Sequence, residues 1–122
     1  MRPPAQTTIV PAGALLSTWE GHAWDGAVLL DRLAVLDRLV VRTRHSVYDI
    51  IVSSPATGDV LVRGGAYFPE FTKARLAGST LGGSFVKVRA IHRGFRLEFT
   101  LSRQFVLTSA VQSIDIIAAA RD

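Results

Sequence analysis

A chain of 122 residues with 48% hydrophobic and 20% charged residues has the composition of one globular domain, and this argues against intrinsic disorder. The formal net charge is +4, and the absence of cysteine excludes disulfides, thiolate metal sites and cysteine nucleophiles, which fits a cytoplasmic location. No apolar run reaches the roughly 18 residues that a bilayer-spanning helix needs, so no membrane association is expected.

The chain begins with a segment that we predict to be a flexible arm over residues 1–23. Prolines and glycines interrupt any regular pattern there, at Pro3, Pro4, Pro11, Gly13 and Gly21. Termini of this kind are commonly mobile. A single domain is expected over residues 24–122.

An α-helix is predicted over about 25–39. Asp25 suits the N-cap, and Trp24 and Leu29 stand at the two positions of a hydrophobic staple. One face of this helix would carry Leu29, Leu33, Leu36 and Val40. The apolar arc is wider than one core-facing stripe requires. Either a second subunit or an open end of a barrel covers it, or the second half of the segment is a strand. We predict a homo-oligomer formed through these four residues.

The pattern changes to period two after Leu39. Residues 39–44 and 47–52 are rich in β-branched side chains, which is typical of strands. Residues 54–58, with Pro55 and Gly58, have the composition of a hairpin loop, and residues 59–63 supply the partner strand. Gly64 and Gly65 then permit a bend.

The second half of the chain continues as short strands. Residues 70–77 are predicted to form one or two helical turns, and the glycine-rich residues 78–84 a flexible loop. Residues 84–91 alternate, so that Val86, Val88 and Ala90 would face the core. A turn at 92–94 leads into a half-buried strand over 95–101, followed by strands over 104–108 and 111–117.

These elements predict a mainly β protein, in which an N-terminal α-helix precedes a small antiparallel barrel over about 39–117. About five to six short strands joined by tight turns are typical of such a barrel. The closing pattern, with a short break at 109–110 before a last strand, resembles SH3-like barrels. That resemblance implies a shape and carries no function.

The charge of the chain is unevenly distributed. Residues 38–107 hold eleven basic and four acidic residues, whereas the remainder holds three basic and six acidic ones. We predict a basic sheet face that binds nucleic acid or another polyanion through Arg42, Arg44, Arg63, Lys87, Arg89, Arg93 and Arg96. Tyr67 or Phe68 beside it would offer a stacking surface for unpaired bases. The alternative is that these charges only keep the wet face of the sheet soluble.

Two separated pieces of the chain resemble the PilZ family. Arg38 and Arg42 have the spacing of its Arg-x-x-x-Arg arm, and residues 78–83 resemble its Asp/Asn-x-Ser-x-x-Gly loop, with Ala77 in place of the acidic or amide residue. The resemblance implies a β-barrel that binds cyclic di-GMP.

Nothing in the sequence predicts catalysis, a metal site or a cofactor. Ser46 follows His45, but neighbouring strand residues point to opposite faces, so they do not form a nucleophile–base pair. We therefore expect a non-enzymatic binding module, namely a nucleic-acid-binding or regulatory small β-barrel that uses a basic sheet face. The first alternative is a structural or protein-interaction module that self-assembles through its N-terminal helix, and the second is a PilZ-like cyclic dinucleotide binder.

Overall fold

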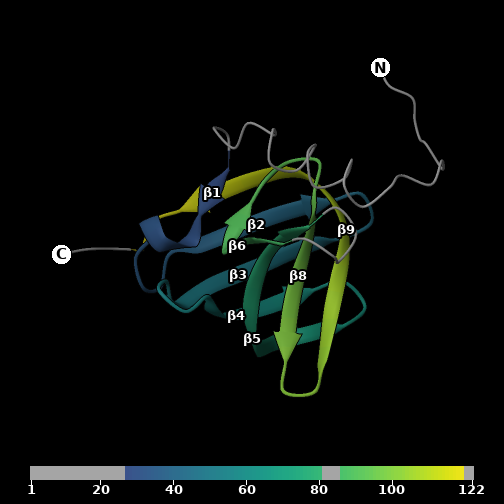
Figure 1. Ribbon diagram of the computed structural model, residues 1–122, viewed down its shortest axis with the longest axis horizontal. Helices are drawn as coiled ribbons and strands as arrows, with labels where there is room; N and C mark the ends of the chain where they lie inside the picture. Colours follow the sequence, from purple (N-terminus) through teal and green to yellow (C-terminus); the bar gives the residue numbers. More distant parts are fainter. Residues whose placement is uncertain (1–26, 81–85, 120–122) are drawn as a thin grey trace.

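The computed structural model describes residues 27–80 and 86–119, and Figure 1 shows them as a strand-rich domain. Their strands are β1 (Val28–Leu29), β2 (Arg38–Thr43), β3 (Val47–Ser54), β4 (Asp59–Gly64), β5 (Phe68–Thr80), β6 (Val86–Val88), β7 (Ala90–Ile91), β8 (Arg96–Leu101) and β9 (Gln104–Ile117). One 3-10 helix, η1 (Leu30–Arg32), follows β1. The prediction of a mainly β protein is confirmed. The predicted arm over 1–23 lies outside the described residues.

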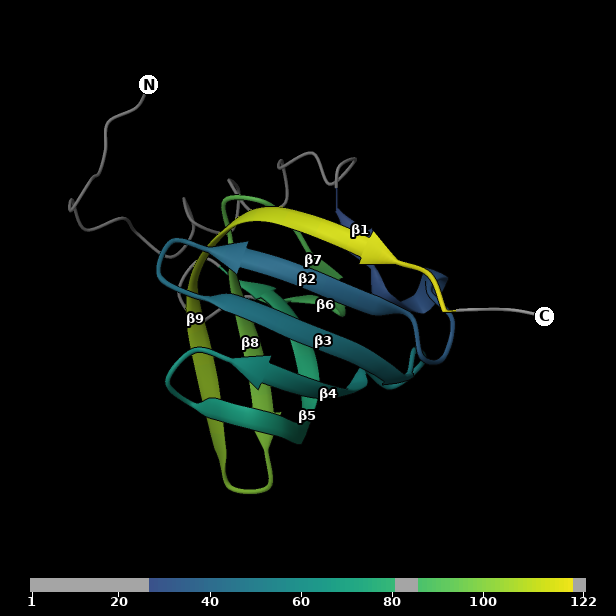
Figure 2. The ribbon, with the colours of Figure 1, turned by 180° about the vertical axis from the view of Figure 1, so that it is seen from behind.

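Six antiparallel strands close into a ring in the order β2, β3, β4, β5, β8, β9 and back to β2. Closure depends on the two longest strands, because each changes partner along its length. Strand β5 pairs first with β4 and then with β8, and β9 pairs first with β8 and then with β2. Figure 2 shows β2, β3 and β4 running across β8 and the first part of β9. The ring confirms a small barrel of six strands, and its resemblance to SH3-like barrels stays a prediction.

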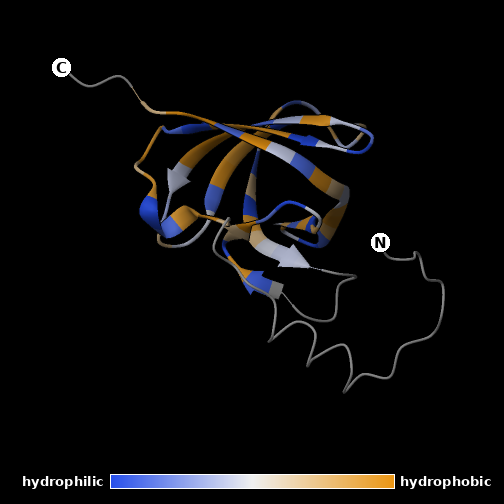
Figure 3. Ribbon diagram, turned by 90° about the horizontal axis from the view of Figure 1, so that it is seen from above, coloured by the Kyte–Doolittle hydropathy of each residue, from blue (hydrophilic) through white to orange (hydrophobic). Residues whose placement is uncertain are grey.

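The core fills the inside of this ring. Hydrophobic and hydrophilic residues alternate along the strands (Figure 3), as expected when one face is buried. The rings of Tyr48, Phe68 and Phe99 pack together, with centroids 5.6 to 6.5 Å apart. Aliphatic side chains from every strand of the ring complete the core, among them Leu39, Val41, Ile50, Val60, Val62, Leu76, Leu97, Val106 and Val111.

The predicted helix over about 25–39 is wrong for its described part, residues 27–39. Strand β1 pairs with β7, and the backbone N–H of Leu30 donates to the carbonyl of Arg89 at 2.9 Å. The buried carboxylate of Asp37 accepts hydrogen bonds from the backbone N–H groups of Ala34 and Ala119, both at 2.8 Å. These long-range contacts outweigh the helix propensity of the leucines. No described helix has the length and apolar character that crossing a membrane requires.

Two smaller predictions are also wrong. Residues 70–77 form part of β5 instead of helical turns, because Ala74 and Leu76 face the core while Lys73 and Arg75 face solvent. Residues 78–80 of the predicted loop continue that strand, and residues 81–85 lie outside the described part of the chain.

Val88, which was expected in the core, is 57% exposed. Arg89 after it has a φ of 50°, and this left-handed residue interrupts the alternation. As a result, the consecutive residues Ala90 and Ile91 are both buried.

Candidate anion-binding site

Strand β9 brings two of the predicted arginines to the same point of the barrel. The backbone N–H of Arg44 donates to the carbonyl of Ala110 at 3.0 Å. On the other side of β9, Arg96 is the register partner of the same alanine. Both arginines are exposed. They therefore flank one residue of β9, although 52 positions separate them in the sequence.

Two further arginines lie beside the residues of β9 that follow Ala110. Arg42 is the register partner of Ser113. The N–H of Gly94 donates to the carbonyl of Val111 at 2.8 Å, which places Arg93 in the adjoining turn. Arg42 and Arg93 are both exposed. We call the four residues Arg42, Arg44, Arg93 and Arg96 the basic cluster.

A cavity of about 340 Å³ opens within this region. Arg44, His45 and Arg96 line it, together with backbone and hydroxyl groups of β9 that include Ser109. Among the described residues that line it, none carries a carboxylate. Guanidinium groups present several N–H donors in a planar fork, the geometry that suits phosphate and carboxylate oxygens.

A network of hydroxyl groups fixes the hairpin that carries Arg44 and His45. The hydroxyl of Thr43 accepts a hydrogen bond from the N–H of Ser46 at 3.1 Å. The hydroxyl of Ser109 donates to Thr43 at 2.8 Å and accepts the N–H of His45 at 3.1 Å. The hairpin is thus tied to β9 before any ligand binds, so less ordering entropy opposes binding there.

No described carboxylate forms an ion pair with the basic cluster. The four ion pairs of the described residues use other arginines, namely Arg38, Arg63, Arg75 and Arg89. The nearest acidic residues along the strands are the half-buried Glu98, two positions after Arg96, and Asp115, two positions after Ser113. Within the part of the chain that the structure describes, no ion pair therefore neutralises the charges of the cluster.

The structure separates the other three predicted contact residues from the basic cluster. Arg63 of β4 pairs with Asp49 at 3.2 Å. Arg89 pairs with Asp31 at 2.7 Å, and this hydrogen-bonded pair lowers the pKa of the Asp31 carboxyl. Lys87 is half-buried on β6. The structure thus brings together four of the seven residues.

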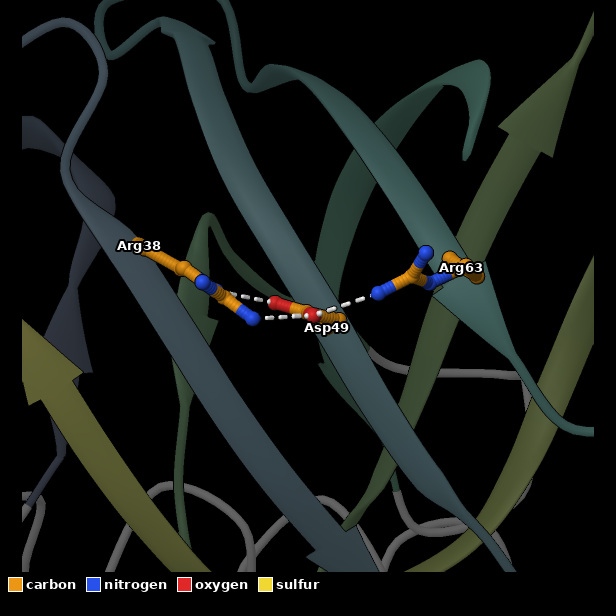
Figure 4. A network of polar contacts seen from close by, with 3 residues as sticks. All are labelled: Arg38, Asp49 and Arg63. Atoms are coloured by element: carbon orange, nitrogen blue, oxygen red, sulfur yellow. Dashed lines mark hydrogen bonds and ion pairs between the residues drawn. The ribbon is translucent and has the colours of Figure 1, made fainter. Parts of the chain in front are cut away.

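Asp49 holds three strands together on the outside of the barrel (Figure 4). Arg38 of β2 donates to both of its carboxylate oxygens at 2.6 Å, and Arg63 of β4 donates to one at 3.2 Å. The guanidinium of Arg63 also lies 4.4 Å from the centre of the Phe71 ring on β5. The hydrogen bonds from Arg38 are the main reason that the pKa of Asp49 lies below its ordinary value of 3.8.

Asp49→Asn is expected to reduce the free energy of unfolding by about 1–2 kcal/mol at neutral pH, since both arginines stay partly solvated. Because the folded pKa is depressed, this contribution is present above the unfolded pKa and is lost as pH falls through the folded value. Urea unfolding at about pH 7 and about pH 3 should show the difference between the two proteins shrinking with acidity. Asp115→Asn, at an exposed site with no described ion pair, should change little at either pH.

The four predicted interface residues do not share a helical face. Leu29 lies in β1 and Val40 in β2, both half-buried, and Leu33 packs against the core. Only Leu36, in the turn before β2, is largely exposed, at 64%. Self-association through these residues therefore loses its structural premise and stays a prediction.

The two PilZ-like pieces lie on different strands. Arg38 and Arg42 are in β2, where Arg38 is held by Asp49, and Gly78, Ser79 and Thr80 are buried in β5. The hydroxyl of Ser79 donates to the carbonyl of Ala90 at 2.7 Å, so it has an internal partner. Residues 81–83 lie outside the described part of the chain. This placement offers no support for cyclic dinucleotide binding.

Sequence reasoning missed His45 and Ser109 as neighbours of the arginines. The break predicted at 109–110 was the available signal, because it marks where β9 passes from β8 to β2. Among the described residues, no three His, Asp or Glu side chains gather as a metal site would require.

Comparisons with protein-family models, with curated proteins and with solved structures found no match.

Proposed function

We propose that this protein is a non-enzymatic module that binds single-stranded nucleic acid through the basic cluster. The observation that carries the proposal is the convergence of four exposed arginines, without a described carboxylate partner, on residues 109–113 of β9. Phosphate contacts supply most of the affinity in such complexes. Several arginines that lie on both sides of β9 suit a ligand with repeated phosphates better than a single anion.

An exposed aromatic ring is the reason for proposing single-stranded nucleic acid as the ligand. Tyr67 is 67% exposed in the turn after β4. That turn follows Gly64, which is the register partner of Tyr48 near the start of β3. The hairpin that carries Arg44 also leads into the start of β3, so the turn and the hairpin adjoin the same end of this strand. Exposed aromatic rings beside a basic surface allow unpaired bases to stack. Phe68, the other ring considered for this role, is buried in the core.

Salt dependence tests the proposal. With about four phosphate contacts, the logarithm of affinity for a single strand should fall with a slope near −2.8 against the logarithm of salt concentration. Anisotropy of a labelled oligonucleotide of about 12 nucleotides should then show about a 50-fold loss of affinity between about 50 and about 200 mM salt. An affinity that stays flat over this range would rule out a phosphate-based interface.

The main alternative is a structural or protein-interaction module whose basic cluster keeps the barrel soluble. It predicts no saturable oligonucleotide binding at low salt, so the same titration separates the two. A cytoplasmic location stays a prediction with either function.

A further inference from the structure

A second and larger cavity lies away from the basic cluster. Its volume is about 560 Å³, within the range of small-molecule sites. The β4–β5 pair lines it near Asp59 and Arg75, and the turn end of β8 near Leu101. Arg96 of the basic cluster stands at the other end of β8, about 17 Å away at the usual rise per strand residue. The two cavities are therefore separate sites.

Much of the wall of this cavity is apolar. Val60, Leu61, Ala74 and Leu101 contribute to it, and Leu101 also packs against the core of the barrel. The cavity lies where β5 passes from β4 to β8, since Arg75 is the register partner of both Asp59 on β4 and Thr100 on β8. Such a wall favours the burial of an aliphatic or aromatic group.

The polar groups around this wall favour an anion. Asp59 is the only carboxylate among the described lining residues. Both of its oxygens are occupied, one by Arg75 at 3.2 Å and one by the hydroxyl of Thr57 at 2.7 Å. Lys73 is exposed and forms no ion pair with a described residue. Counting the described residues alone, the lining thus carries one positive charge, that of Lys73, with no ion-pair partner.

Hydroxyl groups stand beside this charge. Ser53, Thr100 and Ser102 line the cavity, and within the described residues none of their hydroxyls has a protein hydrogen-bond partner. Each can donate to an oxygen of a ligand. A carboxylate near Lys73 would find both a counter-charge and donors.

We propose that this cavity binds a small molecule with an apolar body and one anionic group, whose charge lies against Lys73. This site goes beyond nucleic-acid binding and does not depend on it. Octanoate is a suitable probe because it combines the two features, and octylamine has the same chain with the opposite charge.

The test is a titration of the ¹⁵N-labelled protein followed by amide chemical shifts. Octanoate should give saturable shifts centred on residues 59–61, 73–75 and 100–102, and octylamine should bind at least about fivefold more weakly. Lys73→Gln should weaken octanoate by a similar factor and remove the preference over octylamine, whereas Arg103→Gln, in the turn after β8, should not. The Arg44→Gln/Arg96→Gln protein should bind octanoate normally.

Three results would overturn the proposal: no saturable shifts, shifts centred on residues 109–113, or a Lys73→Gln protein that binds octanoate as the parent does. The amide spectrum of Lys73→Gln itself reports whether the variant is folded. We expect a folded protein, because the substitution lies at an exposed position.

Discussion

Gly78→Ala is expected to lower the free energy of unfolding by about 3 kcal/mol or more. Gly78 has a φ of 143°, a conformation that is essentially restricted to glycine. A Cβ atom added there would also clash with the carbonyl oxygen of Lys87 on β6. Urea unfolding followed by circular dichroism measures the loss.

The effect should be large because Gly78 belongs to two strand pairs. It is the register partner of Val88 on β6 and of Glu98 on β8, at the point where the β5–β8 register shifts. Moving the backbone to accommodate a methyl group would disturb both pairs. The barrel closes through β5, so the damage would not stay local.

Gly94→Ala is the matched control. Gly94 also has a positive φ, of 90°, but no atom of the described residues lies within 4 Å of an added Cβ. Its loss should be about 1–2 kcal/mol, the cost of the left-handed conformation alone. Equal losses for the two variants would show that close packing at Gly78 is not what requires glycine there.

The double substitution Arg44→Gln/Arg96→Gln is expected to weaken single-stranded oligonucleotide binding about 100-fold at low salt. Each lost charge-assisted phosphate contact accounts for about a factor of ten. The salt slope should also fall in magnitude by about 1.4, since two contacts are removed. Fluorescence anisotropy at several salt concentrations measures both quantities.

Lys73→Gln/Arg103→Gln removes the same formal charge from exposed positions outside the basic cluster. If the cluster is the contact surface, this control should lose no more than a few-fold in affinity, through the weaker long-range field alone. Equal losses in the two double variants would mean that net charge, and not the arrangement around β9, determines binding.

The sequence predicts the strands well where each strand has one buried and one solvent-exposed face. Residues 95–101 alternate strictly, and in the structure Phe95, Leu97 and Phe99 are buried while Arg96 is exposed. The hairpin loop at 54–58 is also found, because proline and glycine determine its backbone locally.

The failures lie where long-range contacts decide. Nothing local shows that Leu30 enters the core or that Asp37 accepts the N–H of Ala119, 82 positions away, yet these contacts replace the predicted helix. The break expected at 109–110 is a change of partner within one continuous strand. Sequence spacing cannot show such a change.

The candidate site was predicted only in part for the same reason. The arginines could be named from composition and alternation, but their grouping depends on which strands meet β9. Arg63 and Arg89 belong to the same basic region of the sequence, and the fold places each beside an aspartate.

Amide chemical shifts of the ¹⁵N-labelled protein, titrated with an unlabelled single-stranded oligonucleotide, test the role of the basic cluster most directly. The largest saturable shifts are expected at residues 42–45, 93–96 and 109–113, and they should be lost in the Arg44→Gln/Arg96→Gln protein. Shifts that centre instead on the Asp49 network or on the cavity near Lys73, or an absence of saturable shifts at low salt, would contradict the account.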